Sequence, residues 1–89
     1  MGSASYLHSQ EALYILQNHL ELREKERDEL NVVKRHLLQE IKLPESSYVV
    51  RLVNDELRKR REEIAHIEAD LAERKNLAKL NLQAKAIDP

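Results

Sequence analysis

A proline near the middle of the chain most constrains its fold. Pro44 lies in an 89-residue sequence that contains one other proline, at its end, and a single glycine. Proline removes a backbone donor from a helix, clashes with the preceding turn and moves the residue before it out of the α region. Ser46 and Ser47 then offer side-chain oxygens that can cap a new helix. The sequence therefore predicts two helices of similar length joined by a short turn.

The composition favours long helices packed along a seam over a compact globule. Charged residues make up 35% of the chain and aromatic residues only 3%, with no Phe or Trp. This bias is typical of coiled coils, because too few bulky side chains are present to fill a globular core. We therefore expect an all-α antiparallel helical hairpin, or coiled coil, that dimerises into a four-helix arrangement.

The expected boundaries follow from the caps and from the apolar periodicity. Residues 1–5 are expected to be an expression scar or disordered, and residues 83–89 a frayed tail. The first helix should cover 6–42, the turn 43–47 and the second helix 48–82.

Apolar residues recur in heptads on both expected helices. Each heptad is written abcdefg, with a and d facing the partner helix. The first helix has a positions at Leu13, Leu20, Arg27, Lys34 and Ile41, and d positions at Leu16, Arg23, Leu30 and Leu37. The second helix has a positions at Leu57, Ile64, Leu71 and Ala78, and apolar d positions at Val53 and Ile67. The first half of the seam is thus apolar at its ends and basic in its middle.

The charges at these positions favour an antiparallel pair. Folding the chain at residue 45 places Arg27 opposite Glu63 and Lys34 opposite Glu56. In a parallel homodimer the same arginine and lysine would each face their own copy inside the seam, which is repulsive. Whether the antiparallel pair forms within one chain or is swapped between two chains is left open by the sequence.

More apolar side chains are present than one seam can cover, which indicates an association surface. Symmetry among homo-oligomers favours a homodimer over a foreign protein partner. The residues expected at this surface are Leu13, Leu16 and Leu20 at the open end of the hairpin, and Val33, Leu37, Ile41, Val49, Leu52 and Val53 at the turn end.

Catalysis and metal binding are not indicated by the sequence. Glu63 and His66 have the Glu-x-x-His spacing of di-iron helices, but Ile64 takes the core position between them and the facing Arg27 would repel a cation. The only glycine lies at residue 2, no cysteine is present and no serine stands in a nucleophile motif. We expect no enzyme activity, no cofactor and no metal.

Two further motifs favour ordinary surface roles. The basic run 58–61 resembles a nucleic-acid patch, but its residues point in different directions on a helix and acidic residues flank it on both sides. Ser46 and Ser47 would tolerate phosphorylation at a helix start.

These observations predict a coiled-coil module for self-association and protein–protein interaction, acting as a scaffold or spacer in a larger protein. The alternatives are an adaptor that binds a globular partner such as a small GTPase or cytoskeletal protein, and a nucleic-acid-associated helix using 58–61. The net charge of −1 and the lack of a membrane-spanning run or signal pattern predict an intracellular protein, cytoplasmic rather than nuclear, without membrane partners.

Overall fold

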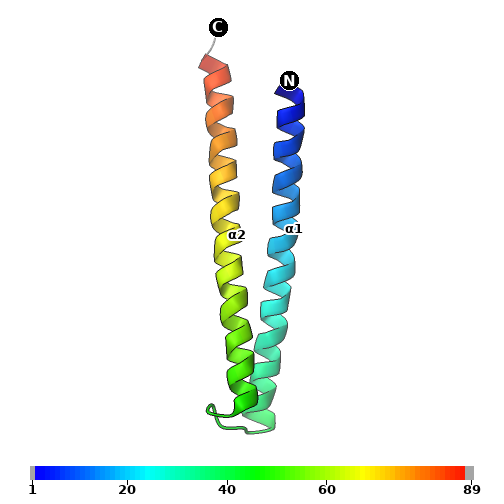
Figure 1. Ribbon diagram of the computed structural model, residues 1–89, viewed down its shortest axis with the longest axis vertical. Helices are drawn as coiled ribbons and strands as arrows, with labels where there is room; N and C mark the ends of the chain where they lie inside the picture. The colour runs from blue at the N-terminus through cyan, green and yellow to red at the C-terminus, as the bar shows by residue number, and fades with distance from the viewer. Residues whose placement is uncertain (1, 88–89) are drawn as a thin grey trace.

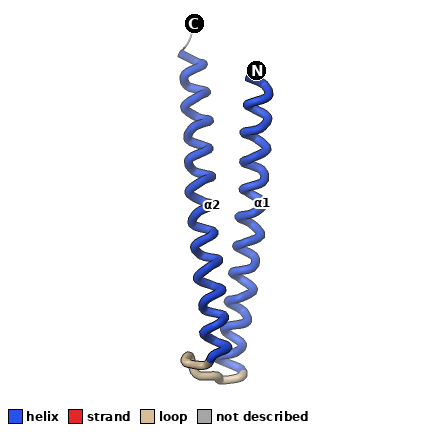
Figure 2. The backbone as a smooth tube through the Cα atoms, viewed as in Figure 1, coloured by secondary structure: helices blue, strands red, loops and turns tan. Residues whose placement is uncertain are grey.

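The computed structural model describes residues 2–87, with side chains described for residues 10–80, and shows two long antiparallel helices (Figure 1). Helix α1 (Gly2–Arg35) continues into a π-helical turn, η1 (His36–Glu40), and helix α2 (Tyr48–Ile87) returns beside it. The rod extends 67 × 18 × 16 Å. Within residues 2–87 all regular structure is helical, and the connection lies at one end of the rod (Figure 2). The predicted all-α antiparallel hairpin is confirmed.

The helix boundaries differ from the expected ones mainly at the ends. The first helix already includes Gly2 and ends at Glu40, whereas 6–42 was expected. Helix α2 begins at Tyr48, as expected, and continues to Ile87, through most of the segment expected to fray. Residues 1, 88 and 89, which belong to the expected scar and tail, lie outside the described residues.

The first helix ends in a widened turn closed by a left-handed residue. The Ile41 N–H donates to the carbonyl oxygen of His36 at 3.0 Å, and the Leu43 N–H donates to that of Leu37 at 2.9 Å. Between them Lys42 has φ 61°. A left-handed residue just after the last turn commonly stops a helix, and here the π-helical turn makes the closing hydrogen bond one residue wider than usual. The chain therefore reverses direction without a glycine.

Pro44 and Ser47 start the second helix. The Ser47 N–H donates to the carbonyl oxygen of Pro44 at 2.9 Å, which closes a four-residue turn. The Ser47 carbonyl then accepts the N–H of Arg51 at 3.0 Å, the first helical hydrogen bond of α2. Ser47 is thus the N-cap residue, and the break expected at Pro44 lies inside the turn.

The core is a single row of side chains on α2. Val50, Leu57, Ile64 and Leu71 are buried at 0%, 1%, 6% and 5% exposure and follow each other at seven-residue intervals. Three of them occupy predicted a positions, and Val50 extends the row one heptad toward the turn. Burying such a side chain stabilises the fold by roughly 1.5–3 kcal/mol. The seam is therefore only one fully buried residue wide.

The left-handed Lys42 generates a stability prediction. An L-residue in this region costs about 1–2 kcal/mol, whereas glycine avoids the steric cost but loses about 0.4–1 kcal/mol through its freer unfolded chain. Lys42→Gly should therefore stabilise the hairpin by about 0.5–1 kcal/mol, seen as a Tm rise of roughly 2–6 °C at equal protein concentration.

The matched control is Lys42→Ala, which removes the charge but keeps the Cβ atom, and it should leave Tm nearly unchanged. Equal Tm values for Lys42→Gly and Lys42→Ala would contradict the left-handed turn.

Candidate interaction surface

A four-residue ionic cluster crosses the seam near the middle of the rod. Arg23 Nε lies 2.7 Å from Glu63 Oε2, and Arg60 Nε donates to Glu26 Oε2 at 2.7 Å. Within each helix, Arg23 also pairs with Glu26, and Arg60 Nη1 lies 3.7 Å from Glu63 Oε1. Both helices carry the pattern Arg-x-x-Glu, so the antiparallel alignment brings each arginine to the glutamate of the other helix. The cluster is a short, nearly symmetric charge layer.

The cluster is ionic at neutral pH. Partial burial raises the pKa of Glu26, but the hydrogen bond from Arg60 and the charges of Arg23 and Arg60 outweigh it, so this pKa lies below its ordinary 4.5. The same hydrogen bond raises the pKa of Arg60. Glu56 adds a further carboxylate, 3.4 Å from Arg60 Nη1. Arg60 and Glu26 are therefore held as an ion pair in the seam.

The cluster also corrects the expected register by about one helical turn. The residue numbers of both pairs across the seam sum to 86, whereas folding at residue 45 required about 90. Glu63 lies against Arg23 instead of Arg27, which pairs with the adjacent Asp28 at 3.2 Å. Lys34 is half-buried, and its expected partner Glu56 binds Lys59 and Arg60 instead. The reason is that the first helix ends at Glu40, so the chain reverses near residue 43.

Most exposed apolar side chains lie on one side of the hairpin. With Leu13 and Val50 as a positions, Glu26 and Glu63 both occupy g positions and both reach across the seam. The g positions of α1 and α2 therefore lie on the same side of the hairpin. The c positions, three or four residues from a g position, lie on this side as well. We name this side the c/g face. Among residues 10–80, it carries seven of the eleven exposed large apolar side chains: Ile15, Leu22, Val33, Val49, Leu52, Leu77 and Leu80.

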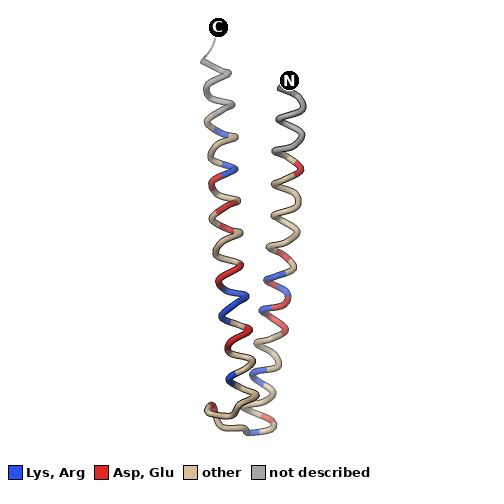
Figure 3. Tube along the Cα trace, in the orientation of Figure 1, with Lys and Arg blue, Asp and Glu red and all other residues tan. Residues whose placement is uncertain are grey.

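The c/g face is apolar at both ends of the rod and charged between them. At the turn end Val33, Val49 and Leu52 are 45%, 46% and 46% exposed. At the open end Ile15 and Leu77 are 48% and 53% exposed. Figure 3 shows that charged residues form a nearly continuous block in the middle of both helices and are more widely spaced next to the turn. The opposite side, at positions b and e, is mainly polar.

The expected surface residues divide into two groups. Val33, Ile41, Val49 and Leu52 are about half exposed, as an association surface requires. The others are half-buried along the seam: Leu13, Leu16, Leu20, Leu37 and Val53. Leu77 and Leu80 were not among the residues predicted for this surface. Leu77 lies four heptads after Val49, and Leu80 lies four heptads after Leu52. Counting heptads from Val50 as an a position would therefore have placed both on the c/g face.

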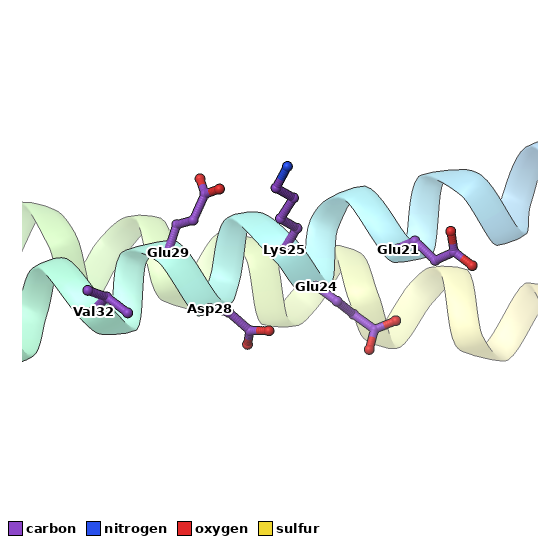
Figure 4. Close-up of a pocket in the computed structure, with 6 residues that line it drawn as sticks. All are labelled: Glu21, Glu24, Lys25, Asp28, Glu29 and Val32. Carbon is purple, nitrogen blue, oxygen red and sulfur yellow. The ribbon is translucent and has the colours of Figure 1, made fainter.

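A shallow groove on the outer surface of α1 offers no convergent site. It is lined by residues of one helix only: Glu21, Glu24, Lys25, Asp28, Glu29 and Val32. In Figure 4 Lys25 and Glu29 point to one side of the helix, whereas Glu24 and Asp28 point to the other. Among the described residues no three His, Asp or Glu side chains are placed to hold a metal ion.

The remaining sequence motifs are engaged in local ion pairs. Glu63 binds arginines on both helices, which leaves the Glu63–His66 spacing without a free carboxylate. In the basic run 58–61, Arg58 pairs with Glu62 at 3.1 Å and Lys59 pairs with Glu56 at 3.3 Å. Arg60 belongs to the ionic cluster. This segment is internally neutralised to a large extent.

Comparison of the chain with models of protein families, with curated proteins and with solved structures finds no match. Neither helix, over the residues described, has the length and apolar character needed to cross a membrane. Inference about function therefore rests on the charge layer and the c/g face.

The register generates a double-mutant prediction. Truncating Arg23 and Glu63 to alanine, singly and together, should reveal a favourable coupling of up to about 1 kcal/mol, since both side chains are partly exposed. The same cycle for Arg27 and Glu63 should give a coupling near zero. Chemical denaturation measures both cycles, and a larger coupling for Arg27–Glu63 would restore the register expected from the sequence.

The lowered pKa of Glu26 predicts a pH-dependent contribution to stability. Because the folded pKa is below the unfolded value, the contribution is fully present above about pH 4.5 and is lost as the pH falls through the folded pKa. The Tm gap between wild type and Glu26→Gln should therefore narrow as the pH falls below about 4.5. Glu73→Gln, on the exposed surface outside the cluster, controls for the loss of one negative charge. A Glu26→Gln gap that does not narrow at any acidic pH at which the protein still folds would contradict the ion pair.

Proposed function

We propose that this chain is a coiled-coil module that self-associates through the c/g face and serves as a scaffold or spacer. The observation that carries the proposal is the row of half-exposed Val33, Val49 and Leu52 on one side of the turn end. Fully burying each such side chain is worth roughly 1.5–3 kcal/mol relative to exposure, so covering the remaining half on two copies favours association.

A second hairpin is the partner that fits this face. The face is long, because both helices run along most of the rod. Two hairpins packed face to face form a four-helix bundle, and a twofold axis would use the same residues on both copies. The half-buried a and d positions would then lie nearer the centre of a wider core.

The scaffold role is supported by the shape and by the charge layer. The rod is 67 Å long, and α1 begins at the same end of the rod where α2 ends (Figure 1), so a partner bound at the turn end would be held far from whatever adjoins the open end. The ionic cluster fixes the alignment of α1 and α2, which a spacer of constant length requires. The proposed role is structural and not enzymatic, since the most buried carboxylate of the cluster, Glu26, is held by two arginines.

A foreign globular partner is the second candidate, and the same exposed face would serve it. The nucleic-acid alternative is less well supported, because three of the four basic residues in 58–61 are paired with glutamates. Molar mass separates the first two candidates, since a chain that stays monomeric would leave the face for another protein.

The proposal predicts that Leu52→Glu lowers the molar mass from two chains to one. Glutamate is a good helix former and position 52 is half exposed, so helicity should be largely retained while a charge enters the interface. Val49→Lys should act in the same way. Light scattering after size exclusion measures the mass, and circular dichroism measures the helicity.

The matched control is Ala65→Glu, an exposed b position on the opposite side of α2, which should leave the mass unchanged. Wild-type protein that is monomeric at high micromolar concentration would refute self-association.

A further inference from the structure

Two acidic residues on the c/g face, Glu29 on α1 and Glu73 on α2, form no ion pair among the described residues. Glu29 occupies an exposed c position of α1 and forms no ion pair with any residue in the described part of the chain. Lys59 occupies an exposed c position of α2, where its ammonium lies 3.3 Å from Glu56. These two side chains have opposite charge and face the same side of the rod.

Glu29 and Lys59 also lie at nearly the same height along the rod. Pairs across the seam have residue numbers that sum to 86, and those of Glu29 and Lys59 sum to 88. Val33 on α1 and Leu52 on α2 are related similarly, with a sum of 85. At two neighbouring heights, therefore, α1 and α2 carry complementary groups: a valine beside a leucine, and a carboxylate beside an ammonium.

We infer that a second copy docks on the c/g face with its turn at the same end of the rod, related by a twofold axis parallel to the rod. This inference rests on the proposed self-association and specifies its geometry. Such an axis brings α1 of one copy against α2 of the other at equal height. Glu29 then meets the partner's Lys59, and Val33 meets the partner's Leu52. The symmetry makes each contact twice.

The opposite docking direction loses this complementarity. A twofold axis perpendicular to the rod would place α1 against the partner's α1, and α2 against the partner's α2. Glu29 and Lys59 lie on different helices, so they would no longer meet. Val33 would then lie next to the open end of the partner and would no longer meet the partner's Leu52. Charge pairing thus favours turn ends that lie together, whereas apolar residues lie at both ends of the face and can meet apolar residues in either direction.

Spin-label distances test the direction. The chain has no cysteine, so a single Glu45→Cys or Asn76→Cys substitution gives one exposed labelling site near each end of the rod. With parallel docking both labels should show interchain distances of roughly 20–30 Å, from two interaxial spacings of 8–10 Å plus the label arms. Reversed docking would separate the Glu45→Cys labels by about 60 Å, the length of a 40-residue helix.

The two labels together also detect a swapped dimer of extended chains. That assembly would keep the Glu45→Cys labels close but move the Asn76→Cys labels to roughly 100 Å apart, at 1.5 Å per residue. Either long distance in a protein with the mass of two chains would overturn the docking direction and leave the proposed self-association standing. A mass of one chain would refute both.

A charge exchange between chains tests the contact itself. Glu29→Lys and Lys59→Glu should each weaken self-association about tenfold, because each homodimer then contains two like-charged pairs. Mixing the two variants should restore affinity to within about threefold of wild type, since both pairs are attractive in the mixed dimer. A mixture that associates no better than its components would overturn the Glu29–Lys59 contact.

Discussion

The whole hairpin depends on a seam that is one fully buried residue wide. Val50, Leu57, Ile64 and Leu71 are the buried apolar residues of the described chain, and they form one straight row on α2. Two helices can enclose such a row but little more, because each presents only one stripe to the other. The remaining apolar side chains must therefore stay half exposed, and the c/g face is the direct consequence of this narrow core.

The charge layer supplies what the narrow core lacks, namely a fixed alignment. An apolar row that repeats every seven residues can slide by a heptad at modest cost, since one leucine resembles the next. The Arg23–Glu63 and Arg60–Glu26 pairs occur at one height only, so a slide would separate both. The end of the first helix selects the register, and we interpret the cluster as holding that register in place, whatever its small net contribution to stability.

The sequence predicted the elements but not their alignment. Pro44, the paired serines and the heptads at Leu57, Ile64 and Leu71 were enough to predict two helices and the start of α2. Their antiparallel direction was predicted from the basic residues in the seam of the first helix, Arg27 and Lys34. The register was missed because Glu63 can pair with an arginine at 23 or at 27, one helical turn apart, and charges alone do not choose between them. The choice follows from the end of the first helix, where a left-handed lysine and a π-helical turn replace the glycine that usually marks a stop. For the surface, the exposed turn-end residues were predicted, but the c/g face emerged only once Val50 fixed the heptads of α2.

The central claim is that two rods of this length lie side by side, and small-angle X-ray scattering with absolute intensity tests it most directly. The mass should be twice the 10.4 kDa of one chain, and the maximum dimension should stay close to the 67 Å of a single rod. A one-chain mass at high micromolar concentration would contradict the claim. So would a two-chain particle of roughly 120 Å or more, the length expected when two helices of 40 residues follow end to end.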